Sequence, residues 1–501
     1  MGANQSKPQR LTNPVYERGS LYGQKYDEIV QDLQKSSSNE FFAYGSNEFF
    51  VDEKFPPDKY SISYCGSMDM LGISLDEVNW VRAKDLYPNA EFIINGSSKD
   101  DINQGLLGDC WFLASLAGLA ERKDLFKKVV PSGQIIKSEN YCGIFKFNFW
   151  KWGEWVEVVV DDFLPVYKNQ PLFTYSDDEG EVWPMLLEKA FAKLHGSYFH
   201  LSGGFTVAAL EALTGGLTER YVGNLGPANP LRGTKDINKD LFQKISYVLS
   251  HGGLVCTGTL LMENLSKGIF GGHAYTITGA YQIEQLNVQL IKIRNPWGNM
   301  VEWIGPWSDN SEEMKNVSWR QAQHLKTGTG EFWMDYQDFL DFYTLVEFTH
   351  TLNDWSLPTF YHGSWENKKS CKFLLTMFKD DEVFLSLEQK YTRESRDELD
   401  SDSTVAPIGV SMFHLPGERT QNLKRHEKIA IDKKNLKSSA MDQVHFGNTA
   451  DWKELTSVTF HNAIKQGQYL VKAARFTKAG SNEFFLRVES RKGNHQLSVL
   501  S

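Results

Sequence analysis

One cysteine in this chain, Cys110, occupies a position at which a thiol could act as a nucleophile. It lies within residues 104–113, which read Gln-Gly-Leu-Leu-Gly-Asp-Cys-Trp-Phe-Leu. The glycines favour a tight turn, and the apolar run after them predicts a helix over residues 111–120 with Asp109 as its cap. The positive end of that helix would face Cys110 and favour the thiolate. A buried structural cysteine is the alternative interpretation, because free cysteine is commonly buried.

Two other segments supply the groups with which a nucleophilic thiol works. Residues 271–279, Gly-Gly-His-Ala-Tyr-Thr-Ile-Thr-Gly, predict a buried strand with His273 at its start. A second strand, over residues 288–293, runs to Asn295, where Pro-Trp-Gly ends it. The connection is short, so we expect antiparallel neighbours that bring His273 and Asn295 to one end. Cysteine, histidine and asparagine are the nucleophile, general base and orienting group of a thiol hydrolase.

With these segments the chain resembles the calpains, a family of calcium-dependent cysteine proteases, from about Phe41 to the C-terminus. Residues 153–162, 186–193 and 201–204 add to the resemblance. It implies a calcium-activated endopeptidase that makes limited cuts in protein substrates through a Cys-His-Asn triad. Two other classes remain open. A transglutaminase would be expected to have Asp in place of Asn295, and a non-enzymatic adaptor with the calpain fold would not require the triad.

The remaining catalytic roles follow from the same chemistry. The side-chain amide of Gln104 and the backbone N–H of Cys110 are the expected donors of an oxyanion hole. Trp297 is expected to cover the hydrogen bond between His273 and Asn295, with an ordinary core tryptophan as the alternative.

The resemblance also implies Ca²⁺ as a cofactor, bound by hard oxygen ligands in a loop of each lobe. The first implied ligand set is the carbonyl groups of Ile94 and Gly96 and the carboxylates of Asp101 and Glu188. The second implied set is Glu302, Asp309, the carbonyl group of Thr327, Thr329 and Glu331. Thr329 stands where the family usually has Asp, and the missing charge is expected to weaken that site. Ordinary solvated loop acids are the alternative for these positions.

The length of 501 residues is too great for one core and predicts several domains. We expect an α+β fold with a mobile segment at 1–45, a two-lobed papain-like core at 46–204 and 205–346, and an antiparallel β-sandwich at 352–501. The resemblance identifies the sandwich as the C2-like domain of calpains. No EF-hand loop pattern occurs in the sequence, so dimerisation with an EF-hand small subunit is not expected.

Composition narrows the class of protein further. The formal net charge of -10 argues against a nucleic-acid partner. Five scattered cysteines without a C-x-x-C pair indicate a reducing compartment and no disulfide scaffold or zinc ribbon. The sequence also has no apolar run of the roughly 20 residues that a membrane helix needs. We therefore expect a cytoplasmic protein.

The N-terminus carries a separate signal. Met-Gly-Ala-Asn-Gln-Ser matches the pattern for N-myristoylation at Gly2, with Lys7 and Arg10 behind it to meet anionic lipid. The pattern is short, so a chance match is the alternative. Because one acyl chain binds membranes only marginally, peripheral association would need a second contact, such as a calcium-dependent one from the C2-like domain.

Overall fold

A computed structural model describes most of the chain. The described residues are 25–29, 31, 49–63, 72–138, 141–222, 237–259, 266–298, 302–309, 311–318, 325, 327, 330–351, 355, 358–365, 370–389, 408–415, 442–448, 457–475 and 483–500. The predictions for Gly2 and for Thr329 lie outside them. The chain forms two compact units: a larger one of residues 16–151 and 155–351, and a smaller one of residues 1–15, 152–154 and 352–501.

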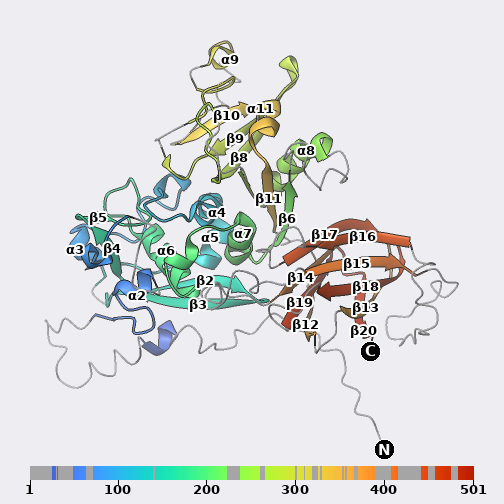
Figure 1. Ribbon diagram of the computed structural model, residues 1–501, viewed down its shortest axis with the longest axis horizontal. Helices are drawn as coiled ribbons and strands as arrows, with labels where there is room; N and C mark the ends of the chain where they lie inside the picture. Colours follow the sequence, from blue (N-terminus) through green and yellow to red (C-terminus); the bar gives the residue numbers. More distant parts are fainter. Residues whose placement is uncertain are drawn as a thin grey trace, which may run out of the picture. The chain divides into compact units, whose positions relative to one another are not determined.

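The larger unit begins with a mixed helical and stranded region (Figure 1). Its elements are α2 (Lys59–Ile62), η2 (Leu75–Glu77), β1 (Asn79–Arg82), α3 (Ala83–Leu86), η3 (Lys99–Asp101), α4 (Cys110–Ala120), α5 (Lys123–Val129), β2 (Ile144–Lys151), β3 (Glu154–Asp161), β4 (Phe163–Tyr167), β5 (Gln170–Pro171), α6 (Trp183–Leu194), η4 (Phe199–Leu201) and α7 (Thr206–Thr214). The helix predicted over residues 111–120 is confirmed as α4. Most of its side chains are buried, as expected for a helix that is apolar all round.

A six-stranded antiparallel sheet dominates the rest of the larger unit. Its elements are β6 (Leu217–Val222), α8 (Ile237–Ser250), β7 (Leu254–Gly258), β8 (Ala274–Ile283), η5 (Glu284–Leu286), β9 (Val288–Arg294), α9 (Glu312–Lys315), β10 (Glu331–Asp335), α11 (Tyr336–Phe342) and β11 (Leu345–His350). The strand order is β10-β9-β8-β7-β11-β6. The predicted antiparallel pairing of the two site strands is confirmed, since β8 pairs with β9 and Thr276 lies opposite Arg294.

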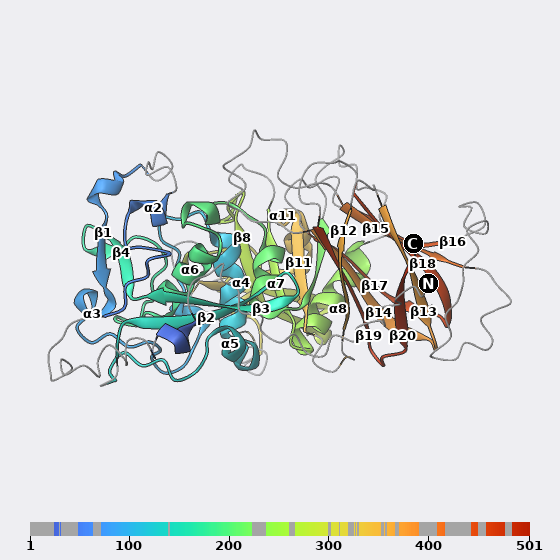
Figure 2. The same cartoon turned by 90° about the horizontal axis from the view of Figure 1, so that it is seen from below.

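The two regions have separate hydrophobic cores. The boundary predicted between residues 204 and 205 does not coincide with the boundary between these cores. Helix α7 follows that point in sequence, yet Leu210 and Leu213 belong to the first core. Figure 2 shows α7 beside α4. The reason is packing: the apolar side chains of α7 cover α4, and sequence order alone does not reveal this.

The smaller unit is an antiparallel β-sandwich. Its strands are β12 (Thr359–Ser364), β13 (Ser370–Met377), β14 (Asp381–Gln389), β15 (Ile408–His414), β16 (Asp442–Asn448), β17 (Ser457–Ile464), β18 (Gly467–Arg475), β19 (Glu483–Ser490) and β20 (His495–Leu500). They form a four-stranded sheet, β12-β19-β14-β17, and a five-stranded sheet, β16-β15-β18-β13-β20. The predicted fold class is therefore confirmed. None of the described helices is both long and apolar enough to span a bilayer.

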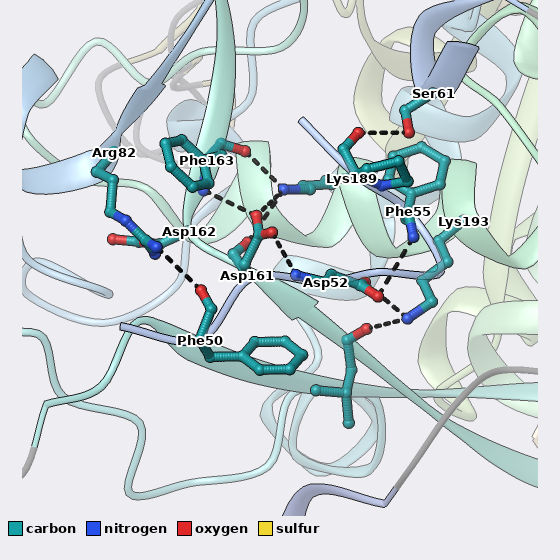
Figure 3. A network of polar contacts seen from close by, with 12 residues as sticks. Phe50, Asp52, Phe55, Ser61, Arg82, Asp161, Asp162, Phe163, Lys189 and Lys193 are labelled. Carbon is teal, nitrogen blue, oxygen red and sulfur yellow. Dashed lines mark hydrogen bonds and ion pairs between the residues drawn. The ribbon is translucent and has the colours of Figure 1, made fainter. Parts of the chain in front are cut away.

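A buried network of charges holds the first region together (Figure 3). Lys189 Nζ on α6 forms an ion pair with Asp161 and donates to the carbonyl of Phe163 at 2.7 Å. One turn later, Lys193 Nζ donates to Asp52 Oδ2 at 2.7 Å. Asp52 N in turn donates to Asp161 Oδ2 at 2.8 Å. The network therefore fixes the segment before α2 against β3 and α6.

Replacing Lys189 by Met should destabilise the larger unit strongly, because it leaves the Asp161 carboxylate buried at 0% exposure without its cation. Breaking a buried pair in this way costs about 3–5 kcal/mol. Urea unfolding followed by tryptophan fluorescence would measure the loss. The control is Lys315→Met, which removes an exposed pair with Glu312 and should cost about 0–1 kcal/mol. Equal losses in the two variants would contradict a structural role for the buried pair.

Candidate active site

Cys110 is the first residue of α4, and its thiol lies beside the start of β8. The backbone N–H of Ala274, the residue after His273, forms a hydrogen bond toward the thiol that acts to lower its pKa. Helix and sheet are joined nearby, where Thr276 Oγ1 donates to the carbonyl of Ala114 at 2.6 Å. The nucleophile predicted from the sequence therefore lies next to the strand that begins after the predicted base.

The predicted base and its orienting group are in direct contact. His273 Nε2 and Asn295 Oδ1 are 2.9 Å apart, and both residues are buried. Asn295 Oδ1 also accepts from Trp297 N at 3.1 Å, which fixes the amide oxygen toward the ring. An amide oxygen can only accept, so Nε2 of His273 carries a proton and Nδ1 is the nitrogen left to act as a base.

Trp297, which was expected to cover this pair, lies against the ring of His273. Its ring centroid lies 4.3 Å from that of His273, and the two planes make an angle of 36°. The ring of Phe270 packs edge-on against that of Trp297, with the two ring centroids 4.5 Å apart. These aromatic rings shield the hydrogen bond between His273 and Asn295 from water, which strengthens it.

In this arrangement both reacting groups are neutral at pH 7. Burial raises the pKa of the Cys110 thiol to about 11, and the charge of Asp109 acts in the same direction. Burial lowers the pKa of His273 to about 4, although the hydrogen bond with Asn295 opposes this shift. Within the described part of the chain, no hydrogen bond joins Cys110 to His273. These two pKa shifts favour a thiol and a neutral imidazole, whereas nucleophilic attack requires a thiolate.

Gln104 lies in the loop before α4 and contacts the second region through its backbone. Its N–H donates to the carbonyl of Pro296 at 3.0 Å. Its side-chain Nε2 donates to the carbonyl of Leu107 at 2.7 Å. The amide predicted for the oxyanion hole is thus engaged within its own loop. It would have to exchange this bond for one to a developing oxyanion.

The structure corrects the prediction that the Asp109 side chain caps α4. Asp109 is the N-cap residue, but its side chain makes no capping hydrogen bond. It is fully buried and faces Glu188, and burial together with that neighbour raises its pKa well above the ordinary range. The Glu188 carboxylate accepts from Thr174 Oγ1 at 2.6 Å. Two buried carboxyl groups in contact must share a proton, because two adjacent charges would repel each other.

This geometry also corrects the first implied calcium set. Glu188 lies with Asp109 and Thr174, so it is not available to Asp101. Asp101 instead forms a group with Asp178 and Glu181, whose ligand atoms all lie within 4.8 Å of one another. Asp178 and Glu181 were not predicted from the sequence as ligands. The acidic run of residues 177–181, just before α6, is the signal that could have identified them.

The new acidic group has the chemistry of a hard-cation site. Burial raises the pKa of Asp101 to about 6 and that of Glu181 to about 7, and the neighbouring carboxylates add to both shifts. Glu181 Oε1 accepts from the N–H of Ile94 at 2.7 Å, which brings it to the loop that contains the predicted carbonyl ligands Ile94 and Gly96. Clustered carboxylates and loop carbonyls are the oxygen donors that Ca²⁺ prefers. These residues therefore fit the implied ion.

The second implied set is only partly assembled. Thr327 Oγ1 donates to Asp309 Oδ2 at 3.1 Å, and burial together with Asp309 raises the pKa of Glu302. Glu331 is engaged elsewhere, since it accepts from Thr278 Oγ1 at 2.6 Å and lies 3.4 Å from Lys292 Nζ. Among the described residues, the only group of three or more acidic, histidine or cysteine side chains close enough to share an ion is the one around Asp101.

Two cations join the two regions next to this group. Arg294, which is buried at the end of β9, donates through Nη2 to the carbonyl of Ile102 at 2.8 Å. Lys99 Nζ lies 3.9 Å from Glu331 and 3.8 Å from Glu121. The loop that contains Asp101 is thus connected to the strand that ends one residue before Asn295.

Comparison with known proteins gives a consistent result. The profile of the calpain family cysteine proteases matches residues 50–350, which is more than half of the chain. Calpain-1 catalytic subunit of Mus musculus is 34% identical over 495 residues, covering 89% of this chain and 65% of the relative. Calpain-1 catalytic subunit of Homo sapiens is 33% identical over 519 residues, covering 94% of this chain and 67% of the relative.

Calpain-A of Drosophila melanogaster is 31% identical over 515 residues, covering 93% of this chain and 58% of the relative. The chain thus spans about two thirds of the mammalian relatives' length and less of the insect protein. The resemblance noted from the motifs is confirmed by these matches: the chain belongs to the calpain family of cysteine proteases.

Proposed function

We propose that this chain is a calcium-activated cysteine endopeptidase that makes limited cuts in protein substrates. The observation that carries the proposal is the contact of 2.9 Å between His273 and Asn295, with Cys110 at the start of α4 beside the same strand. This is the arrangement of nucleophile, base and orienting group that acyl transfer from a peptide requires. Family membership supports the same reaction.

The reaction begins with a proton transfer. Nδ1 of His273 takes the proton of the Cys110 thiol, and Asn295 holds the resulting imidazolium through its Nε2–H. The Cys110 sulfur then attacks the peptide carbonyl, and the backbone N–H of Cys110 and the Gln104 amide donate to the oxyanion. His273 gives its proton to the leaving amine. Water hydrolyses the acyl-enzyme by the same steps.

Calcium has a structural part in this proposal. Asp101, Asp178 and Glu181, with the carbonyls of Ile94 and Gly96, would hold the ion in the first region. A bound Ca²⁺ supplies positive charge that compensates these carboxylates. Their loop contacts the second region through Arg294, which donates to the carbonyl of Ile102. A change in this loop therefore reaches β9 and the neighbouring Asn295.

Thiol reactivity should report this activation directly. Without calcium, the raised thiol pKa of about 11 predicts that alkylation of Cys110 by iodoacetamide accelerates about tenfold per pH unit between pH 7 and 10. With calcium, an ion pair with His273 should give fast alkylation that is nearly independent of pH in this range. Peptide mapping by mass spectrometry measures the rate, with Cys371 as internal reference. A flat profile without calcium would contradict the neutral resting state.

Casein cleavage tests the proposed activity and its ligands. The wild type should cleave casein only with calcium, and Cys110→Ser should not cleave it. Glu181→Gln should raise the calcium concentration for half-maximal cleavage about tenfold or more, because ligand charge tunes calcium affinity over orders of magnitude. Glu179→Gln is the matched control, since this exposed neighbour lies outside the acidic group. Cross-linking of casein would indicate acyl transfer to amines instead, and equal calcium titrations would remove Glu181 as a ligand.

We also propose that the protein is cytoplasmic and reaches membranes peripherally through a myristoyl group on Gly2. The Met-Gly-x-x-x-Ser pattern supports this. Gly2→Ala should shift part of the protein from the membrane to the soluble fraction of cells, and the shift should be partial because one acyl chain binds weakly. Ala3→Ser, at a position that the pattern leaves free, should partition like the wild type. Identical partitioning of all three would show that the match is accidental.

A further inference from the structure

A pocket outside the catalytic residues lies on the first region of the larger unit. It has a volume of about 560 Å³ and is bordered by α5, by residues 131–137 and by residues 91–97. This volume falls within the range of ligand-binding pockets, about 300–1,000 Å³. Its apolar lining includes the side chains of Phe92, Phe126, Val130 and Ile136. Ile135 also lines it and is 60% exposed, so an apolar surface is left open to water.

The walls of this pocket are held in place by hydrogen bonds. Gln134 Nε2 donates to the carbonyls of Pro131 and Lys146 at 3.0 Å each, and its Oε1 accepts from Lys146 N at 2.7 Å. These bonds attach one wall to β2. On the opposite wall, Ser97 Oγ donates to the carbonyl of Ala120 at 3.2 Å. The pocket is therefore preformed, which is the usual condition of a small-molecule site.

Positive charge lines the same pocket. Lys123 and Lys127 are four residues apart on α5, so they lie on one face of the helix. No carboxylate in the described part of the chain forms an ion pair with either of them. The third lysine, Lys137, is paired with Glu91. The lining thus combines an apolar interior with two ammonium groups that form no ion pair among the residues that the structure describes.

We propose that this pocket binds an amphipathic anion, a molecule with an extended apolar body and a single carboxylate-type head. The body would cover Ile135 and fill the space between Phe126 and Phe92. The head would pair with Lys123 and Lys127. A neutral apolar ligand would leave both lysines uncompensated, and a small polar anion would leave the apolar lining exposed. The pocket shares no residue with the triad, and its only residue in common with the proposed calcium ligands is Gly96, which would bind the ion through its backbone carbonyl.

Calorimetric titration of dodecanoate, below its micelle concentration, into the full chain with Cys110→Ser tests the proposal. One molecule should bind. Lys127→Glu should weaken binding at least tenfold by reversing a charge in the lining, and Ile135→Glu should do the same by placing a carboxylate against the ligand. Lys127 and Ile135 are both exposed, so neither substitution should impair folding. Unchanged Tm values of the two variants would verify this. Lys128→Glu is the matched control, because this exposed neighbour does not line the pocket.

The head group is tested with dodecanol, which keeps the apolar body and lacks the charge. It should bind at least tenfold more weakly than dodecanoate. No dodecanoate binding, or equal binding to the Lys127→Glu, Ile135→Glu and Lys128→Glu variants, would overturn the site. Dodecanol binding as tightly as dodecanoate would overturn the assignment of an anion. Casein cleavage is measured separately on the wild type, because Cys110→Ser is expected to be inactive; dodecanoate binding without casein cleavage by the wild type would overturn the proposed activity and leave this site standing.

Discussion

The burial of α4 is the constraint on which the site depends. This helix is apolar on every side and lies within the first hydrophobic core, where it packs against α7 as well as against β7 and β8. The chain just before α7 passes very close to α4. A Cβ atom at Gly204 would lie 2.6 Å from the Trp111 ring, so only glycine fits there. Because the second region supplies part of the cover, the first residue of the helix must lie beside β8.

Packing places the reacting groups, whereas electrostatics decides whether they can react. Desolvation disfavours charge on Cys110 and on His273 alike. Asp109, which is coupled to Glu188, also disfavours a negative charge on the thiol. An ion pair between thiolate and imidazolium would compensate both desolvation costs at once, since opposite charges in a dry site attract strongly. Conformation and ionisation are therefore coupled in this site, and neither can change far without the other.

Much of the fold around the catalytic residues could be predicted from local sequence. Cys110, His273 and Asn295 stand in turn-rich segments beside strongly apolar elements, so their helix and strands were predictable, and so was the meeting of His273 with Asn295 across a short connection. The contacts that Glu188 makes were not predictable from local sequence. It lies on α6 and contacts residues 109 and 174, which are remote in sequence, and no periodicity reports such contacts. The protonation states were also inaccessible, because they depend on burial in three dimensions.

The buried charge network also limits how much of the N-terminus can be removed. Arg82 Nη2 donates to the carbonyl of Phe50 at 3.0 Å, and Lys193 depends on the carboxylate of Asp52. A proteolytic cut well before Phe49 would leave these contacts intact. A cut after Asp52 would strand the Lys193 ammonium in the interior with only the carbonyl of Val159 to accept from it. Trimming past this point therefore breaks the charge network within a few residues, and a stable form of the larger unit must include this segment.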